Sequence, residues 1–381
     1  MGNYNCSKFC HSCQNETNLN NGTNNIDNTN DNSQKKMFLY NNKENLNQND
    51  LDDEIKNKFE ENLPKIGSYI PLNEFNDLVG KEVRTYIKNY KLSYEKYMPK
   101  DLRIFPFKPI KLKDNNIYKG YWNKDMEIEG YGIFINNDTK IITEGIWVKG
   151  NLVFGRIFFP NKDIYEGEIN NSIPEGKGKF FFSNNDIYEG DFKNGEMNGK
   201  GYFLFEDNTK YEGNIENGLF KGMGNMKWNN GIEYIGNFLD SSLCGEGIIT
   251  NRNNKEKYKG NFDKNEFNGK GIYYYENGDE YEGNFEYGIK KGKGLFKTKN
   301  GLIYDGDWNN DMPNGNGEIT YQGKKIKGYW RNGIFIGNND LIENKEDINK
   351  DIKPNKFGIL TCNLTHLDTF YRITSQYTAE N

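Results

Sequence analysis

Residues 188–205 read YEGDFKNGEMNGKGYFLF, and this stretch decides the fold. Tyr188, Gly190 and Phe192 alternate with two acidic residues, so an extended strand places the rings and the glycine on one face. The following strand repeats this alternation with Gly199, Gly201, Phe203 and Phe205. The stretch therefore predicts two strands that share one face of aromatic rings and glycines.

The same pattern recurs about every 23 residues between residues 106 and 338, which is typical of a stacked repeat array. The first strands of the units begin near residues 118, 144, 165, 188, 211, 234, 258, 281, 304 and 327. A GxG element follows in each unit except the second and the last, which carry Gly155-Arg156-Ile157 and Gly337-Asn338-Asn339 in its place. The array is thus expected to contain about ten hairpins.

Turn sequences separate the strands, for example SNND at 183–186, NNG at 229–231 and ENG at 276–278. Such turns favour hairpins that follow one another in one antiparallel sheet. We expect the rings of one hairpin to lie over the glycines of its neighbour, so that ring area is buried without a second layer. The predicted fold is mainly β: an elongated single-layer antiparallel sheet of tandem β-hairpins, with an N-terminal helix as a cap and a disordered N-terminal tail.

The sequence divides into five parts. Residues 1–63 are rich in Asn and charged residues and are predicted to be a disordered tail. Residues 64–105 hold a helical cap segment, because apolar residues recur at helical spacing over 72–98; a partner-binding helix is the alternative. The array at 106–338 follows, then a charged linker at 339–356 and a C-terminal segment at 357–381.

Composition restricts the function. The net charge of −5 gives no electrostatic reason to expect nucleic acid as a partner. The five cysteines offer no disulfide framework, and neither a membrane-spanning stretch nor a secretory signal is present. The only two histidines, His11 and His366, lie in terminal segments, so we expect no enzyme, cofactor or metal site. The GxG pairs are expected to serve packing, because a phosphate loop needs one glycine-rich turn before a helix.

The pattern Y-[EKD]-G-x-[FW] followed by GxG resembles the membrane occupation and recognition nexus (MORN) repeat over about 230 residues. The resemblance implies a scaffold or adaptor at a membrane, a cytoskeletal structure or a site of cell division. It also implies homodimers and phospholipid binding in some members. We therefore expect a protein partner, such as a helix, to bind the sheet through its repeat-face aromatic residues: Tyr165, Tyr188, Phe192, Tyr211, Tyr234, Phe238, Tyr258, Phe262, Tyr281, Phe285, Tyr304 and Trp308.

The N-terminus, MGNYNC, carries Gly2 where myristoylation requires it, with Cys6 in place of the favoured Ser or Thr. Cys6, Cys10 and Cys13 are predicted palmitoylation targets, and two acyl chains would hold the protein on the cytosolic face of a plasma or cortical membrane. A zinc site formed with His11 and an unmodified tip are the alternatives. Docking of the repeats themselves on anionic lipid is a further alternative, through Lys177, Lys200, Lys270 and Lys293.

Overall fold

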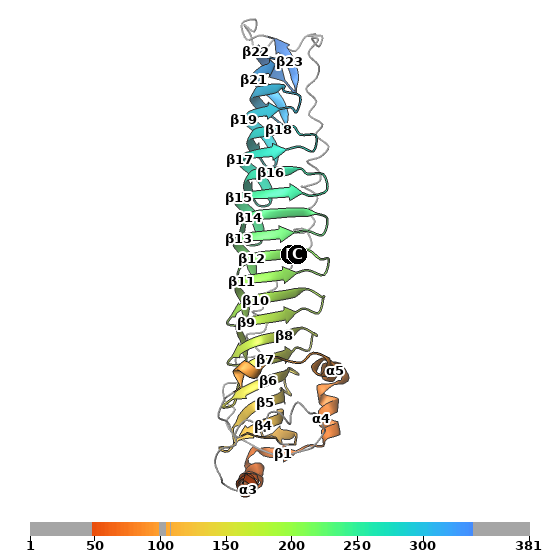
Figure 1. Ribbon diagram of the computed structural model, residues 1–381, viewed down its shortest axis with the longest axis vertical. Coiled ribbons are helices and arrows are strands. Elements are labelled where there is room, and N and C mark those ends of the chain that lie inside the picture. Colours follow the sequence, from red (N-terminus) through yellow and green to blue (C-terminus); the bar gives the residue numbers. More distant parts are fainter. Residues whose placement is uncertain (1–47, 99–103, 107, 338–381) are drawn as a thin grey trace. The chain divides into compact units, whose positions relative to one another are not determined.

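The computed structural model describes residues 48–98, 104–106 and 108–337. Its fold is mainly β, with the strands in an open antiparallel sheet, which confirms the predicted fold class. The chain divides into two compact units, an N-terminal unit that ends at Gly201 and a C-terminal unit that begins at Tyr202. Within each unit, consecutive strands lie side by side (Figure 1).

The N-terminal unit begins with the helices and short strands that precede the repeats. These are α3 (Gln48–Ile66), β1 (Gly67–Tyr69), α4 (Leu72–Val79), α5 (Lys81–Asn89), the 3-10 helix η1 (Glu95–Tyr97), β2 (Ile104–Pro106) and β3 (Ile110–Leu112). The repeat strands are β4 (Ile117–Asn123), β5 (Ile128–Ile135), β6 (Ile142–Val148), β7 (Asn151–Phe158), β8 (Ile164–Asn170), β9 (Ile173–Phe181), β10 (Ile187–Lys193) and β11 (Glu196–Leu204), which contains the boundary.

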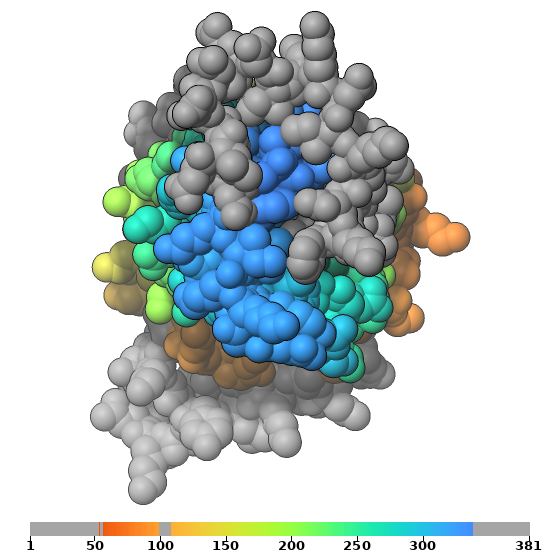
Figure 2. All heavy atoms as spheres, turned by 90° about the horizontal axis from the view of Figure 1, so that it is seen from above, coloured from red at the N-terminus to blue at the C-terminus, as the bar shows by residue number. Residues whose placement is uncertain are grey.

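The C-terminal unit continues the same hairpins. Its strands are β12 (Lys210–Glu216), β13 (Leu219–Lys227), β14 (Ile232–Leu239), β15 (Ser242–Asn251), β16 (Lys257–Asp263), β17 (Glu266–Tyr274), β18 (Glu280–Glu286), β19 (Ile289–Lys297), β20 (Ile303–Asn309), β21 (Met312–Tyr321), β22 (Lys324–Arg331) and β23 (Ile334–Gly337). Figure 2 looks onto the last strands, drawn in blue.

The hairpin turns require left-handed backbone. In the turn after β10, Asn194 and Gly195 have φ of 50° and 83°, and in the turn after β12, Asn217 and Gly218 have φ of 51° and 77°. Two successive residues with positive φ define a type I′ turn, whose twist matches that of the flanking strands. Asn and Gly tolerate this backbone best, so these dipeptides fix where each strand reverses.

The glycines of successive strands pair with one another across the sheet. In the C-terminal unit, Gly213 pairs with Gly224, which also pairs with Gly236 on the far side. The ring of Tyr211 lies over Gly213 and Gly224, its own hairpin's pair, so a Cβ atom on Gly224 would meet the ring at 2.6 Å. For the tyrosine rings, the prediction that the rings of one hairpin lie over the glycines of its neighbour is therefore wrong; the tyrosine ring reaches two residues along its own strand and across to the paired strand.

The two glycines of GxG have different roles. The first has a positive φ, for example 70° at Gly222, because it lies in a bulge where residues 221–223 of its own strand face the single residue Asn214 of the paired strand. The second is the one beneath the tyrosine ring. In the second repeat, Gly155 pairs with Gly145 and Gly167, so it corresponds to the second glycine of GxG. Our alignment of Gly155 with the first glycine was wrong: the unit retains the glycine that the sheet needs for close approach.

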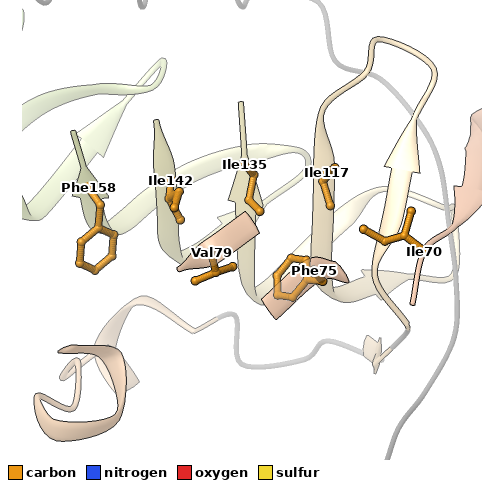
Figure 3. Close-up of a cluster of buried hydrophobic side chains, with 7 residues drawn as sticks. All are labelled: Ile70, Phe75, Val79, Ile117, Ile135, Ile142 and Phe158. Carbon is orange, nitrogen blue, oxygen red and sulfur yellow. The ribbon is translucent and has the colours of Figure 1, made fainter. Parts of the chain in front are cut away.

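The predicted helix over 72–98 is two helices. Gly80, with φ of 77°, separates α4 from α5, and α5 ends at Asn89. Phe75 and Val79 of α4 pack on a row formed by Ile117, Ile135, Ile142 and Phe158 of four neighbouring strands (Figure 3). The segment thus packs on the first repeats as predicted, but it forms a second layer there instead of closing the end of the array.

The predicted tail begins to fold before residue 63. Helix α3 starts at Gln48, and Phe59 is fully buried with its ring 6.1 Å from that of Trp122. The boundary at residue 63 was therefore placed too late, because the charged residues of α3 hid one apolar anchor. The rest of the tail, the linker and the C-terminal segment lie outside the described residues.

Candidate functional site

One face of the repeat sheet, here called the ring face, carries the tyrosine that eight of the repeats share and, four residues later, an aromatic residue or Ile. A ring of one unit packs edge-on against the tyrosine of the preceding unit, with centroid distances of 4.9 to 5.2 Å. These contacts are Tyr165–Phe192, Tyr211–Phe238, Tyr234–Phe262, Tyr258–Phe285, Tyr281–Trp308 and Tyr304–Trp330. Edge-to-face geometry is favourable for aromatic pairs, so the rings join successive units.

Each tyrosine hydroxyl also has a fixed partner. It donates to the backbone carbonyl three residues later, over 2.9 Å in Tyr188 to Asp191 and 2.7 Å in Tyr211 to Asn214. In the second case, Asn214 faces the bulge of β13 and lies outside the regular pairing of the two strands. The bond explains why the repeat uses Tyr here where Phe would supply the same ring.

Burial changes the acidity of these hydroxyls. It raises the pKa of Tyr165, Tyr211, Tyr234, Tyr258, Tyr281 and Tyr304 far above the ordinary tyrosine value. A tyrosinate in this environment would lose its hydration, so the rings stay neutral over the physiological range.

The predicted partner-binding rings are therefore inaccessible in this conformation. All of them are buried, and every tyrosine among them has a relative exposure of 0%. Binding of a protein by the sheet stays a prediction, but burial leaves the residues beside the rings and on the opposite face as the surface that a partner can contact.

A lysine replaces the usual apolar residue over one of these rings. Lys290 is buried, with its Nζ 5.4 Å from the ring centre of Tyr281 and 5.5 Å from that of Trp308. Its Nζ also lies 3.9 Å from Asp311 Oδ1. Cation–π attraction and the ion pair together allow the ring face to hold this charge.

The opposite face of the sheet, here called the outer face, carries the x residue of Y-x-G and the middle residue of GxG. Acidic and basic side chains pair across it, as in Lys179–Glu189 and Lys297–Glu280, both at 3.0 Å. The lysines suggested for docking on anionic lipid lie on strands of this face, and two of them are paired with acidic residues: Lys177 of β9 with Asp191, and Lys293 of β19 with Asp307. Opposed in this way, they have less positive charge to offer an anionic surface.

The first repeats differ, because the N-terminal segment covers their outer face. Tyr97 of η1 stacks on Phe154 at 4.0 Å and donates a 2.8 Å hydrogen bond to Glu168 Oε1. In α5, the ring of Tyr86 lies over the Arg156 guanidinium at 5.4 Å. The covering segment therefore binds the outer face through aromatic rings as well as through α4.

Beneath this segment lies a buried ion cluster that the sequence did not reveal. Arg156 contacts Glu144 Oε2 at 3.2 Å and Glu166 Oε2 at 2.8 Å, and Tyr131 donates to Glu144 Oε1 at 2.7 Å. Burial raises the pKa of Glu144, although the bonds from Tyr131 and Arg156 oppose the rise. The signal available in the sequence was the arginine at a position where no other repeat carries one.

The predicted acylation residues Gly2, Cys6 and Cys10 lie outside the described residues. Within the described part, no group of three or more His, Cys, Asp or Glu side chains is arranged to hold a metal ion. No described helix combines the length and the apolar character needed to span a bilayer.

Sequence reasoning also missed an apolar area of the outer face. Met223, Ile235 and Leu239 are exposed there, although the equivalent positions of other units are mostly charged or polar. The signal was present in the motif YIGNF at residues 234–238, which has Ile where most units have Glu or Lys.

Comparison with known proteins agrees with the repeat geometry. The MORN repeat model matches residues 165–187, 188–210, 211–233, 258–280, 281–303 and 304–323. The unit at 234–257, which contains Ile235, is not among these matches. No curated protein matches the chain.

Among solved structures, the TCP10 domain of Danio rerio CPAP is 12% identical, with a TM-score of 0.33 over 58% of this chain and 100% of that one. The TCP domain of Drosophila melanogaster SAS-4, solved with a proline-rich motif of Ana2, is 14% identical, with a TM-score of 0.21 over 56% of this chain and 89% of that one. Scores this low support no inference about partners. The six matched segments and the tyrosine-over-glycine geometry within them establish that this chain contains MORN repeats.

Proposed function

We propose that the protein is a non-enzymatic scaffold that gathers protein partners at the cytosolic face of a membrane. The proposal rests on one observation: the two faces of the sheet differ in accessibility. The ring face is filled by the chain's own aromatic residues, whereas the outer face changes from unit to unit and stays accessible over most of the array. A constant framework with variable exposed residues suits several partners bound along one sheet.

Membrane attachment is assigned to the N-terminus. Gly2 stands where an N-myristoyl group is added, and Cys6 and Cys10 supply thiols for palmitoyl groups beside it. One acyl chain binds a bilayer only marginally, and a second makes attachment stable. A homodimer remains a further proposal from the family resemblance.

The alternative is a phospholipid-binding module in which the repeats dock directly on anionic membrane. Two of the lysines proposed for it, Lys177 and Lys293, form ion pairs with Asp191 and Asp307. Because the benefit of a basic residue near an anionic leaflet requires that it be unopposed, these pairs favour the acyl anchor over direct docking.

Membrane fractionation separates the two. In cells, Gly2→Ala combined with Cys6→Ser, Cys10→Ser and Cys13→Ser should move the full-length protein from the membrane to the soluble fraction. Full-length protein made without acylation should not bind phosphatidylserine vesicles. If the variant stays on membranes and the unacylated protein binds these vesicles, the repeats themselves are the anchor and our assignment is wrong.

Partner binding needs its own measurement. Proximity labelling from the full-length protein should mark the same proteins in wild type and in a non-acylated variant returned to the membrane by an unrelated anchor. A labelled set that is indistinguishable from that of the unrelated anchor alone would refute the scaffold role.

A further inference from the structure

The outer face of the C-terminal unit carries an apolar patch, defined here as Met223, Ile235, Leu239 and Ile248. Met223, Ile235 and Leu239 have relative exposures of 55%, 46% and 53%. Met223 of β13 pairs with Asn237 of β14 and so lies diagonally between Ile235 and Leu239, while Ile235 pairs directly with Ile248 of β15. The four side chains are therefore contiguous over three strands.

The patch is a local departure from the repeat. At the position of Ile235, other units carry Lys119, Glu166, Glu189, Glu212, Lys259, Glu282, Asp305 and Lys327. Most equivalents of Met223 are charged or polar, including Lys177, Lys200, Glu246, Lys270, Lys293 and Asn316. A cluster of exposed apolar residues, found at positions that are charged or polar in most other repeats, indicates an interaction site better than a single exposed apolar residue does.

A basic strip borders the patch on one side. The strip consists of residues that follow one another in register across β12 to β16, namely Lys210, Lys227, Glu233, Thr250 and Lys257. Arg252 also belongs to it, because its side chain contacts Glu233. Glu233 binds both neighbours: Lys227 Nζ lies 2.9 Å from its Oε1, and Arg252 Nε donates to its Oε2 over 2.9 Å. The strip contains four basic residues, Lys210, Lys227, Arg252 and Lys257, and one carboxylate, so its net charge is positive and complements a carboxylate-bearing partner.

The chain itself shows which element the outer face accepts. In the N-terminal unit, α4 lies across the outer face of β4–β7 and inserts Phe75 and Val79, which are four residues apart, between Ile117, Ile135 and Ile142. Residues at this spacing share one helix face. The apolar patch lies on the same face of the sheet and offers a second helix aliphatic side chains of the same chemical kind.

We propose that the outer patch binds an amphipathic helix of a protein partner, with apolar residues at i and i+4 in the patch and Asp or Glu residues along the flank that meets the basic strip. This inference rests on the proposed scaffold function and adds to it a location and a partner chemistry. Recognition through apolar anchors four residues apart is a general mode for helices bound to apolar surfaces.

The probe is a fluorescent synthetic helix of about 18 residues with Leu at i and i+4 and Glu along one flank. Its matched control has Lys in place of Glu and the same Leu residues. Fluorescence anisotropy with full-length protein should show binding of the acidic peptide and binding at least about tenfold weaker for the basic one.

Variants locate the site. Ile235→Glu and Leu239→Glu should each weaken the acidic peptide at least about tenfold, and Arg252→Glu should weaken it while strengthening the basic peptide. Met312→Glu, an equivalent change at an exposed residue outside the patch, should leave the affinity unchanged. All four residues are exposed, so circular dichroism should confirm that each variant folds.

Several outcomes would overturn the proposal. Equal affinity for both peptides refutes the charge chemistry, and unchanged binding by Ile235→Glu refutes the location. Dimerisation that Ile235→Glu abolishes would make a second copy the occupant, and peptide binding only after removal of residues 339–381 would make the chain its own occupant. If the peptide does not bind, and the Ile235→Glu variant still labels the same partners as the wild type, the scaffold function stands and this patch is not its site.

Discussion

The glycine beneath a tyrosine ring can be tested directly at Gly224. A Cβ atom there would lie 2.6 Å from Tyr211 Cε2, 2.7 Å from its hydroxyl oxygen and 2.9 Å from Cζ. Because carbon atoms in contact normally lie about 3.5 to 4.0 Å apart, the ring must move by about 1 Å. That ring is buried, stacked on Phe220 at 3.7 Å and edge-on to Phe238 at 5.2 Å, so it has no space to enter.

The cost of Gly224→Ala follows from these contacts. Overpacking of a filled core costs about 1 to 3 kcal/mol. Displacement of the ring also breaks the 2.7 Å hydrogen bond from Tyr211 to the Asn214 carbonyl, worth about 1 kcal/mol. We therefore expect a loss of about 2 to 4 kcal/mol of unfolding free energy.

Gly222→Ala is the matched control in the same GxG. Its Cβ would meet only the Asn214 side chain at 3.4 Å, so its cost comes from φ of 70° and should be about 1 to 2 kcal/mol. In a Tyr211→Ala background, Gly224→Ala should cost less than about 0.5 kcal/mol, whereas Gly222→Ala should cost the same as before.

Guanidinium unfolding followed by circular dichroism gives the stability. Amide exchange over residues 211–227 reports whether the loss is local, which is needed because repeat arrays depart from two-state unfolding. Equal costs for both alanine variants, or no coupling between Gly224→Ala and Tyr211→Ala, would refute the steric role assigned to the second glycine.

Three further predictions follow from burial and charge. Phe75→Ala should release α4 at a cost of about 3 to 5 kcal/mol and open residues 70–98 to limited proteolysis, unlike Leu78→Ala on the exposed side of the same helix; equal cleavage of both would contradict this. Arg156→Ala should cost about 3 to 5 kcal/mol in chemical unfolding by leaving Glu144 buried without its cation, and Arg156→Met with Glu144→Leu should recover most of it. Because burial raises the pKa of tyrosines such as Tyr211 and Tyr258 above the unfolded value of 10.0, their contribution to stability is fully present below that pH and declines above it. Urea midpoints should therefore fall between about pH 8 and pH 11, and the absorbance of the buried tyrosines should rise only on unfolding; ionisation of all tyrosines in the folded protein would be the contrary result.

The repeat period and the alternation of rings with glycines predicted the hairpins, because these properties are local to about 23 residues. The choice of which glycines a ring covers could not be read in the same way. Tyr211 covers Gly224 because the bulge of β13 opposite Asn214 shifts the register between β12 and β13, and register depends on both strands together.

The N-terminal segment shows the same limit more strongly. Its helical periodicity was visible, but the burial of Arg156 and Glu144 beneath it depends on two parts of the chain that lie far apart in sequence. The importance of Ile235 was also hidden in the sequence. A single apolar residue at a repeat position that is otherwise charged looks like ordinary variation, and only the structure places Met223 and Leu239 beside it.

The sequence by itself determined that this protein is an array of antiparallel hairpins, because the spacing of Tyr, Gly and the second ring leaves the strand as the conformation that places them on one face. Only the tertiary structure decided which face is filled and which is open. Ring burial closes the ring face along the array, and on the outer face the N-terminal segment covers the first repeats while Met223, Ile235 and Leu239 remain exposed. That difference arises from contacts between strands and helices, whose partners no single segment specifies.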